Sequence, residues 1–292
     1  MMHRYTTRRQ AINLGLITLS SATTIAVRAA TPHRIVSVGG ALTEIIYALQ
    51  AQAELVGVDT TSSYPAPAQL LPSVGYARTL SAEGLLALTP TLVMVTEDAG
   101  PVPVLRQVAK AGISVETLAA NHQVEGLMDR INRVGELTSR VPQAKALQLM
   151  IRQEWAQVQT KIDKSRSKPA RVLFVLAHTP NQIMVAGRGT SAQAMLNYAG
   201  ASNAMQGFSG YKPLTPEAVI AAQPDLILLT DQGLRAAGGV DGILKLPGLA
   251  QTGAGRARRV VSMDALFLLG FGPRLPQAVA GLHSAIDSVY AV

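Results

Sequence analysis

The chain has 292 residues, a formal net charge of +8 and no cysteine. Without cysteine it cannot form disulfides, thiolate metal sites, a cysteine nucleophile or a lipid-modified N-terminal cysteine. The positive charge favours an anionic ligand, and we interpret the two basic runs, 161–171 and 256–259, as solvated surface and not as a nucleic-acid site.

The first thirty residues have the features of a secretory signal peptide. A basic start with Arg8 and Arg9 precedes an apolar stretch over 11–27, and Ala29-Ala30 offers a cleavage site. The stretch is too short and too rich in hydroxyl groups for a membrane span. It leaves general secretion and twin-arginine export both open. Loss of its four arginines lowers the formal net charge from +8 to +4, and we expect a soluble periplasmic protein.

From residue 31 on, apolar strands alternate with helices in two similar blocks. In the first block we predict strands over 34–38, 55–58 and 92–95 and a helix that Thr43 and Glu44 open and that runs to Leu49. In the second block we predict strands over 171–176, 226–229 and 259–262 and a helix over 191–199. Each strand is a continuous apolar run, which indicates parallel sheets buried on both faces.

The segment between the blocks is helical. Apolar residues recur there at three- and four-residue spacing, and residues 143–164 contain neither glycine nor proline. Trp155 lies on this apolar stripe and is expected to pack. We therefore predict an α/β protein with two similar Rossmann-like lobes, joined by one long rigid helix, and a ligand cleft between the lobes. The predicted boundaries are 1–30 for the signal peptide, 31–123 for the N-terminal lobe, 124–167 for the linking helical segment and 168–292 for the C-terminal lobe.

One unit occurs twice, once in each predicted lobe. Leu80–Glu97 and Leu214–Asp231 each contain a helix start, a short helix, a proline turn, an apolar strand and an acidic end. Glu83 and Glu217 occupy the same place in the unit, 134 positions apart (217 − 83). A glutamate in the first turn complements the helix dipole and can close a capping box.

Four stretches resemble one known family: Val58–Ser62, Val74–Gly84, Asn203–Phe208 and Met263–Arg274. They are similar to the periplasmic haem-binding proteins of ABC importers (the HmuT type), and the resemblance covers essentially the whole mature chain. It implies two α/β lobes bridged by one helix, a fold shared with vitamin B12 and siderophore binders. It also implies a substrate-binding protein, with no enzymatic activity, that captures ferric haem and delivers it to an ABC permease dimer in the inner membrane.

The resemblance places the haem-iron ligand on Tyr76, whose phenolate oxygen is a hard donor that suits ferric iron. Arg78 is a cation that favours the phenolate, and in an extended segment it points to the same side as Tyr76. His178 follows a strand directly and is either a second iron ligand or the ligand of a second stacked haem, so one or two haems are expected per chain. A structural or surface role is the alternative for both Tyr76 and His178.

Further residues complete the expected site. Tyr211, Lys212 and Arg235 are candidate contacts of the haem pocket and the propionates. Glu97 and Asp98 would repel propionates if they lie at the cleft, which leaves the propionate orientation open. The remaining histidines of the mature chain are expected on the surface without partners: His33, His122 and His283.

The resemblance also gives the repeated glutamates a role. In the resembled family a glutamate at the top of each lobe docks into arginine pockets of the permease. This assigns permease docking to Glu83 and Glu217, with a simple role at the helix start as the alternative.

Three other kinds of protein fit parts of the sequence. A vitamin B12 or ferric-siderophore binder has the same fold, and the pair Tyr76 and Arg78 favours haem over it. Residues 187–192 match the G-x-G-x-x-A fingerprint of a nucleotide-dependent α/β enzyme, but no acid follows about twenty residues later. A free zinc or manganese carrier requires several His, Asp or Glu ligands, and one histidine is expected near the cleft. We expect a monomer that binds no nucleic acid and does not span the membrane.

Overall fold

The computed structural model describes residues 1–2, 33–164, 168–179 and 182–289. The predicted signal peptide, apart from its first two residues, lies outside the described residues. The residues from 33 on belong to a single unit, His33–Val292, which contains both predicted lobes. Among the described residues, no helix is long and apolar enough to cross a membrane.

The first sheet has four strands, all parallel, in the order β2-β1-β3-β4. Its elements are β1 (Ile35–Val38), β2 (Leu55–Val58), β3 (Leu92–Thr96), β4 (Ser114–Leu118), α1 (Gly40–Ala48), α2 (Ala82–Leu86) and α3 (Val102–Lys110), with the 3-10 turns η1 (Gln52–Glu54) and η2 (Ala66–Leu70). The helix predicted to open at Thr43 and Glu44 begins earlier, at Gly40, and both side chains are buried inside α1. Those two residues are therefore not a helix start.

The second sheet is mixed. Parallel strands β10 (Val260–Met263), β9 (Leu226–Thr230) and β5 (Arg171–Thr179) match the prediction, and β7 (Ser202–Asn203) also pairs with β5. Beyond β5 the sheet continues with antiparallel strands β6 (Gln182–Ala186) and β8 (Tyr211–Pro213), which the sequence patterns did not predict. The helices here are α6 (Ser191–Tyr198), α7 (Pro216–Ala222), α8 (Asp231–Ala236), α9 (Gly239–Leu244), η3 (Leu249–Gln251), α10 (Gly253–Arg256), α11 (Ala265–Leu269) and α12 (Leu275–Ser288).

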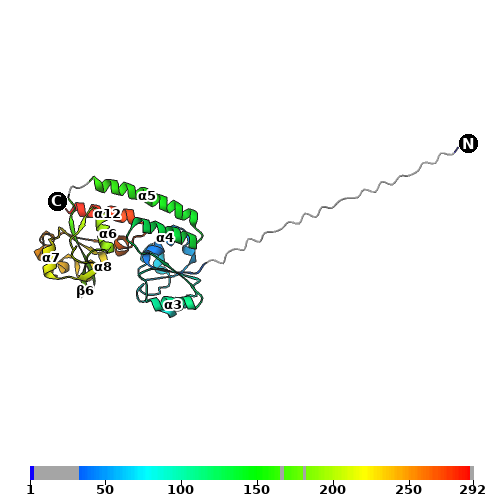
Figure 1. Cartoon of the computed structure of the whole chain (residues 1–292), viewed down its shortest axis with the longest axis horizontal. Coiled ribbons are helices and arrows are strands. Elements are labelled where there is room, and N and C mark those ends of the chain that lie inside the picture. The colour runs from blue at the N-terminus through cyan, green and yellow to red at the C-terminus, as the bar shows by residue number, and fades with distance from the viewer. Residues whose placement is uncertain (3–32, 165–167, 180–181, 290–292) are drawn as a thin grey trace. The chain divides into compact units, whose positions relative to one another are not determined.

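Two helices connect the sheets, α4 (Val124–Leu137) and α5 (Val141–Asp163). The helix α4 packs on α1, and the long helix α5 lies alongside both α4 and α12 (Figure 1). Trp155 of α5 packs edge-on against Tyr198 of α6, with ring centroids 4.9 Å apart. The expected long linking helix and the packing role of its tryptophan are therefore both observed, and the predicted α/β fold class is confirmed.

The core follows the alternation of side chains along the strands. In β3, Leu92 and Met94 face one hydrophobic cluster, while Val93 and Val95 face another on the opposite side of the sheet. In β5, Val172 and Phe174 join the same cluster as Leu92 and Met94. One face of each sheet therefore contributes to a single core shared by both sheets, together with residues from α1, α4, α5, α6 and α12.

Candidate functional site

Tyr76 lies just beyond the carboxyl end of β2. The chain from Ser73 runs parallel to the end of this strand: the Val74 amide donates to the Val58 carbonyl at 2.9 Å and the Thr60 amide to the Gly75 carbonyl at 3.0 Å. Gly75 has a φ of 88°, which only glycine adopts without strain, and it turns the chain into Tyr76. Tyr76 is 44% exposed, so its ring is available at the edge where open α/β sheets bind ligands.

The segment after Tyr76 is a turn. The Thr79 amide donates to the Tyr76 carbonyl at 2.9 Å, so the extended conformation considered for residues 76–78 is wrong. Backbone bonds from Gly100 to the Ala77 carbonyl (2.8 Å) and from Leu80 to the Gly100 carbonyl (2.9 Å) fasten this turn to the loop after β3. The backbone that carries Tyr76 and Arg78 is therefore held at both ends.

Arg78 is paired with Asp98 of that loop. The Arg78 Nη2 lies 2.9 Å from Asp98 Oδ2, and both side chains are partly exposed. The hydrogen bond to Asp98 raises the pKa of Arg78, and the neighbouring phenol groups of Tyr76 and Tyr211 act in the same direction. Partial burial alone would raise the pKa of Asp98, but hydrogen bonds from Thr96 and Arg78 lower it overall. This site therefore carries a charged pair beside the exposed tyrosine.

Tyr211, a residue of the second sheet, lies near Arg78. It lies in β8, largely buried, with its hydroxyl 3.5 Å from the Ser191 hydroxyl. Burial raises its pKa, while the hydrogen bond with Ser191 and the charge of Arg78 oppose the rise. Both Tyr76 and Tyr211 act on the pKa of Arg78, so the two tyrosines lie near the same guanidinium. Tyr76, Arg78 and Tyr211, with Asp98, are the candidate site.

The other predicted contacts are less closely tied to this site. Lys212 is exposed, and its Nζ lies 5.2 Å from the centroid of the Phe208 ring. Arg235 is exposed in the last turn of α8. Among the described residues we find no hydrogen bond or ion pair that joins either side chain to Tyr76 or Arg78. Their roles stay predictions.

His178 lies within β5, where the pairing with β6 is irregular between Ala177 and Thr179. The strand therefore continues past the predicted end at residue 176 and includes this histidine. Its role as a second iron ligand stays a prediction.

The expectation that His122 and His283 lie on the surface without partners is wrong. The His122 ring packs on Phe271 at 5.2 Å between centroids, and burial, together with the charge of Arg130, lowers its pKa. His283 Nδ1 lies 3.0 Å from the Ala199 carbonyl oxygen, and its Nε2 lies 3.2 Å from Asp287 Oδ2. Helical spacing alone did not reveal these partners because most come from distant parts of the chain.

The two acids after β3 have separate partners. Glu97 Oε1 accepts from the Ala120 amide at 3.1 Å, whereas Asp98 pairs with Arg78. Only Asp98 therefore touches the candidate site, and there it meets a cation. An acid immediately after a buried parallel strand was the sequence signal for this residue, but its pairing with Arg78 was not predicted.

The repeated glutamates occupy matching positions. Ser81 and Thr215 cap α2 and α7 with nearly identical backbone angles, and each accepts from the amide three residues on, at 3.0 and 3.4 Å. Glu83 and Glu217 are the second residues of these helices and are exposed. A capping box requires the glutamate at the third position, where Gly84 and Ala218 stand. These carboxylates therefore complement the helix dipoles but close no capping box.

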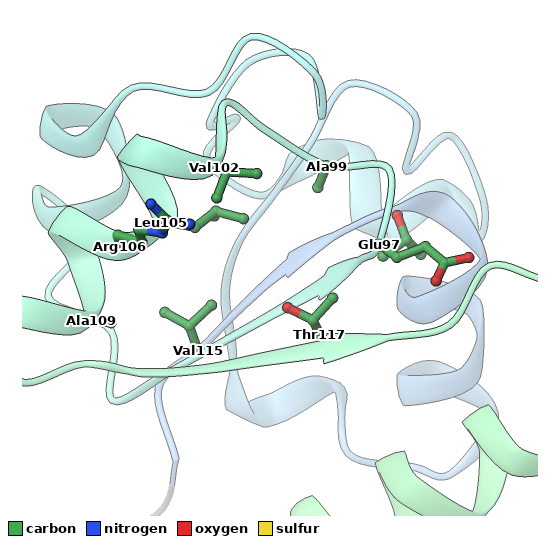
Figure 2. Close-up of a pocket in the computed structure, with 9 residues that line it drawn as sticks. Glu97, Ala99, Val102, Leu105, Arg106, Ala109, Val115 and Thr117 are labelled. Carbon is green, nitrogen blue, oxygen red and sulfur yellow. The ribbon is translucent and has the colours of Figure 1, made fainter.

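A pocket of about 270 Å³ lies elsewhere, between α3 and the edge strand β4 (Figure 2). Its walls are largely apolar, and Arg106 and Glu97 are its charged lining residues. None of the predicted site residues lines it, so we do not assign the pocket to the ligand. In the described part of the chain, no cluster of three or more His, Asp or Glu side chains could hold a metal ion.

Two α/β lobes, one with a parallel and one with a mixed sheet, and an exposed tyrosine with a paired arginine beyond the end of β2 define a ligand-binding protein of the two-lobed class. A family model described as periplasmic binding protein matches residues 35–266. The chain belongs to this family.

Solved structures agree with this assignment. The periplasmic haem-binding protein BhuT in complex with two haems is 47% identical, with a TM-score of 0.84, over 88% of this chain and 98% of that one. The periplasmic haem-binding protein RhuT from Roseiflexus sp. RS-1 in its apo form is 41% identical, with a TM-score of 0.86, over 89% of this chain and 99% of that one.

Curated relatives are more distant. The ABC transporter substrate-binding lipoprotein YvrC of Bacillus subtilis is 27% identical over 89% of this chain and 80% of its own length. A vitamin B12-binding protein of Photorhabdus laumondii is 27% identical over 56% of this chain and 59% of its own length. The identity to the haem-binding structures is thus higher, and the match covers more of their own length.

Proposed function

We propose that this protein binds ferric haem in the periplasm and delivers it to an ABC permease. The observation that carries the proposal is the exposed Tyr76 beyond the carboxyl end of β2, with Arg78 beside it and Tyr211 of β8 near the same guanidinium. The 47% identity to a haem-binding protein, over almost the whole of both chains, supports the same ligand.

The chemistry of the site suits haem better than a free metal ion. A porphyrin supplies four nitrogen ligands, so the protein needs to add one or two donors. Tyr76 offers a hard oxygen donor, which suits ferric iron. Arg78, beside it, favours a negatively charged oxygen and can also meet a propionate.

The number of haems depends on a second ligand. His178 stands near the carboxyl end of β5, the strand of the second sheet that pairs with β6. We infer that Tyr76 captures the first haem and that His178 acts on a second haem or as a second ligand. The two haems of the similar BhuT structure support the larger capacity.

Delivery is assigned to the exposed glutamates. Glu83 and Glu217 stand at equivalent places in α2 and α7, one for each lobe. A permease dimer with pseudo-twofold symmetry requires such a matched pair. We infer that both carboxylates bind in basic pockets of the permease. We also infer that the protein acts as a monomer and that residues 1–30 direct its export. It carries its ligand without catalysing a reaction.

A titration of the purified apo-protein tests the proposed ligand. Hemin should produce a saturable Soret band with one tight equivalent, whereas cyanocobalamin and a ferric siderophore should leave the tyrosine fluorescence and the melting temperature unchanged. Tight binding of cyanocobalamin without binding of hemin would refute the proposal in favour of the vitamin B12 relatives.

A further inference from the structure

One segment of the second lobe lies against the first lobe. It comprises α11 and the loop to α12, residues 264–274. Leu266 packs on Gly40 so closely that a methyl group at Gly40 would come within 2.6 Å of its Cδ1. The Phe271 carbonyl accepts a hydrogen bond from Arg130 Nη2 at 2.8 Å. The segment therefore contacts both α1 and α4.

The strongest contact of this segment is Arg274 with Glu44 of α1. The guanidinium forms a fork on the carboxylate, with Nη2–Oε1 at 2.6 Å and Nε–Oε2 at 3.0 Å. The Glu44 side chain is only 4% exposed. Two residues 230 positions apart are thus joined in a bidentate geometry, which fixes direction as well as distance.

Two aromatic rings lie against the guanidinium. Arg274 Cζ lies 3.7 Å from the centroid of the Tyr64 ring and 4.9 Å from that of Phe267. Tyr64 belongs to the first lobe and follows β2, whereas Phe267 belongs to α11. The arginine is therefore oriented by both lobes at once, a constraint that a lysine could not reproduce.

We propose that Arg274 is a positioning residue: through Glu44 it holds the second lobe at the one separation that presents Tyr211 to Tyr76. The inference rests on the proposed function for the identity of the ligand, but not for the contact itself. Tyr211 belongs to β8 and Tyr76 follows β2, so their relative placement depends on how the two lobes are joined. The fork, the aromatic stack and the close contact of Leu266 all act at that junction.

A positioning role differs from a purely stabilising one. Replacing both charges of a buried ion pair by apolar groups of similar size is often neutral or stabilising, because the cost of desolvating the charges disappears with them. Such a replacement removes the directional fork while leaving the fold intact. We therefore expect a change in lobe geometry without a loss of melting temperature.

Distances between spin labels can measure this change. The chain contains no cysteine, so Gln107→Cys in α3 and Gln232→Cys in α8, both exposed, give one label in each lobe. Pulsed dipolar spectroscopy on the ligand-free protein should show one narrow distance distribution. In Glu44→Met/Arg274→Met the distribution should broaden and gain a longer component. The affinity for hemin should fall about three- to tenfold, since only the fraction of molecules with the original separation binds.

Two further variants serve as a control and as a fallback. Glu116→Gln removes an ion pair of similar length, Arg133 Nε–Glu116 Oε1 at 2.7 Å, that joins β4 to α4 and involves no residue of the second lobe, and it should leave the distribution unchanged. Glu44→Gln alone replaces the double variant if the latter does not fold. A wild-type distribution in the Glu44 variants, or equal broadening in Glu116→Gln, would overturn the proposal. Failure of the wild type to bind hemin would instead refute the proposed function, because the distances are measured without ligand.

Discussion

Replacing Tyr76 by phenylalanine removes one oxygen atom and leaves the ring in place. Tyr76 is 44% exposed, and among the described residues no hydrogen-bond partner of its hydroxyl is found. Substitutions of this kind change the free energy of unfolding by less than about 0.5 kcal/mol. For a unit of this size, 1 kcal/mol corresponds to about 2–4 °C, so the melting temperature should move by less than about 2 °C.

The same change should weaken haem binding strongly. A hydrogen bond to a charged group contributes about 1.5–3 kcal/mol, and with the lower figure as a minimum for the bond between phenolate and ferric iron we expect at least about a 10-fold loss of affinity. Because the phenolate is the expected iron ligand, the charge-transfer band of phenolate to ferric iron should disappear as well. Both quantities are measured by titrating apo-protein with hemin at neutral pH while recording the visible spectrum.

The structure offers a matched control for this experiment. Tyr64 is 45% exposed and also follows β2, but its ring stacks on Arg274. Phenylalanine preserves that stacking, so Tyr64→Phe should retain both the affinity and the charge-transfer band. If Tyr76→Phe keeps the band and Tyr64→Phe loses it, the ligand has been assigned to the wrong tyrosine.

Four further outcomes are expected. Glu83→Ala/Glu217→Ala should keep the hemin spectrum and a melting temperature within a few degrees, whereas ATP-driven uptake into vesicles containing the permease should collapse; normal uptake would leave the glutamates as helix-start residues. His178→Ala should still bind one tight equivalent of hemin in a titration, and complete loss of binding would reverse the roles of His178 and Tyr76. Burial lowers the pKa of His122, so the imidazole takes up a proton less readily in the folded protein than in the unfolded chain. In urea denaturation the wild type should therefore lose more stability than His122→Gln as the pH falls below 6.5. Equal loss of stability in the two proteins would contradict this. Burial raises the pKa of Glu44 above its usual 4.5 despite the charge of Arg274, so the folded protein binds this proton more readily than the unfolded chain. The stability of the wild type relative to Glu44→Gln should therefore increase as the pH falls from neutral towards 4.5. A stability difference that does not change with pH would show that Glu44 does not titrate in this range.

Strands β1, β2, β3, β5, β9 and β10 were predictable from the sequence. Strands β3, β5 and β9 contain continuous apolar runs, and β1 is apolar except for Ser37, because helices cover both faces of the sheet there. Strands β4, β6, β7 and β8 were missed, although β6 lies inside its sheet. The edge strand β4 is mostly exposed or half-buried, and β8 contains Lys212 and Pro213, so neither has an apolar run to detect.

The candidate site was predictable only in part. The motif with Tyr76 and Arg78 and its place beyond a strand follow from local sequence. The partner of Arg78 does not, because Asp98 reaches it through a loop fastened by backbone bonds. Glu44 shows the same limit more strongly: in the sequence it looks like a helix-start glutamate, but its partner Arg274 is 230 positions away. Contacts of this kind depend on how the lobes pack.

The shared core has a consequence for how the protein folds. Ile35 and Met94 of the first sheet belong to the same buried cluster as Val172 and Phe174 of the second, with α5 and α12 contributing to it. A chain cut before β5 would leave one face of each sheet without its partner surface and expose it to water. The two halves should therefore melt in a single cooperative transition. Neither half should form a stable domain when expressed alone, so a binding-dead variant of one lobe cannot be rescued by supplying that lobe in isolation.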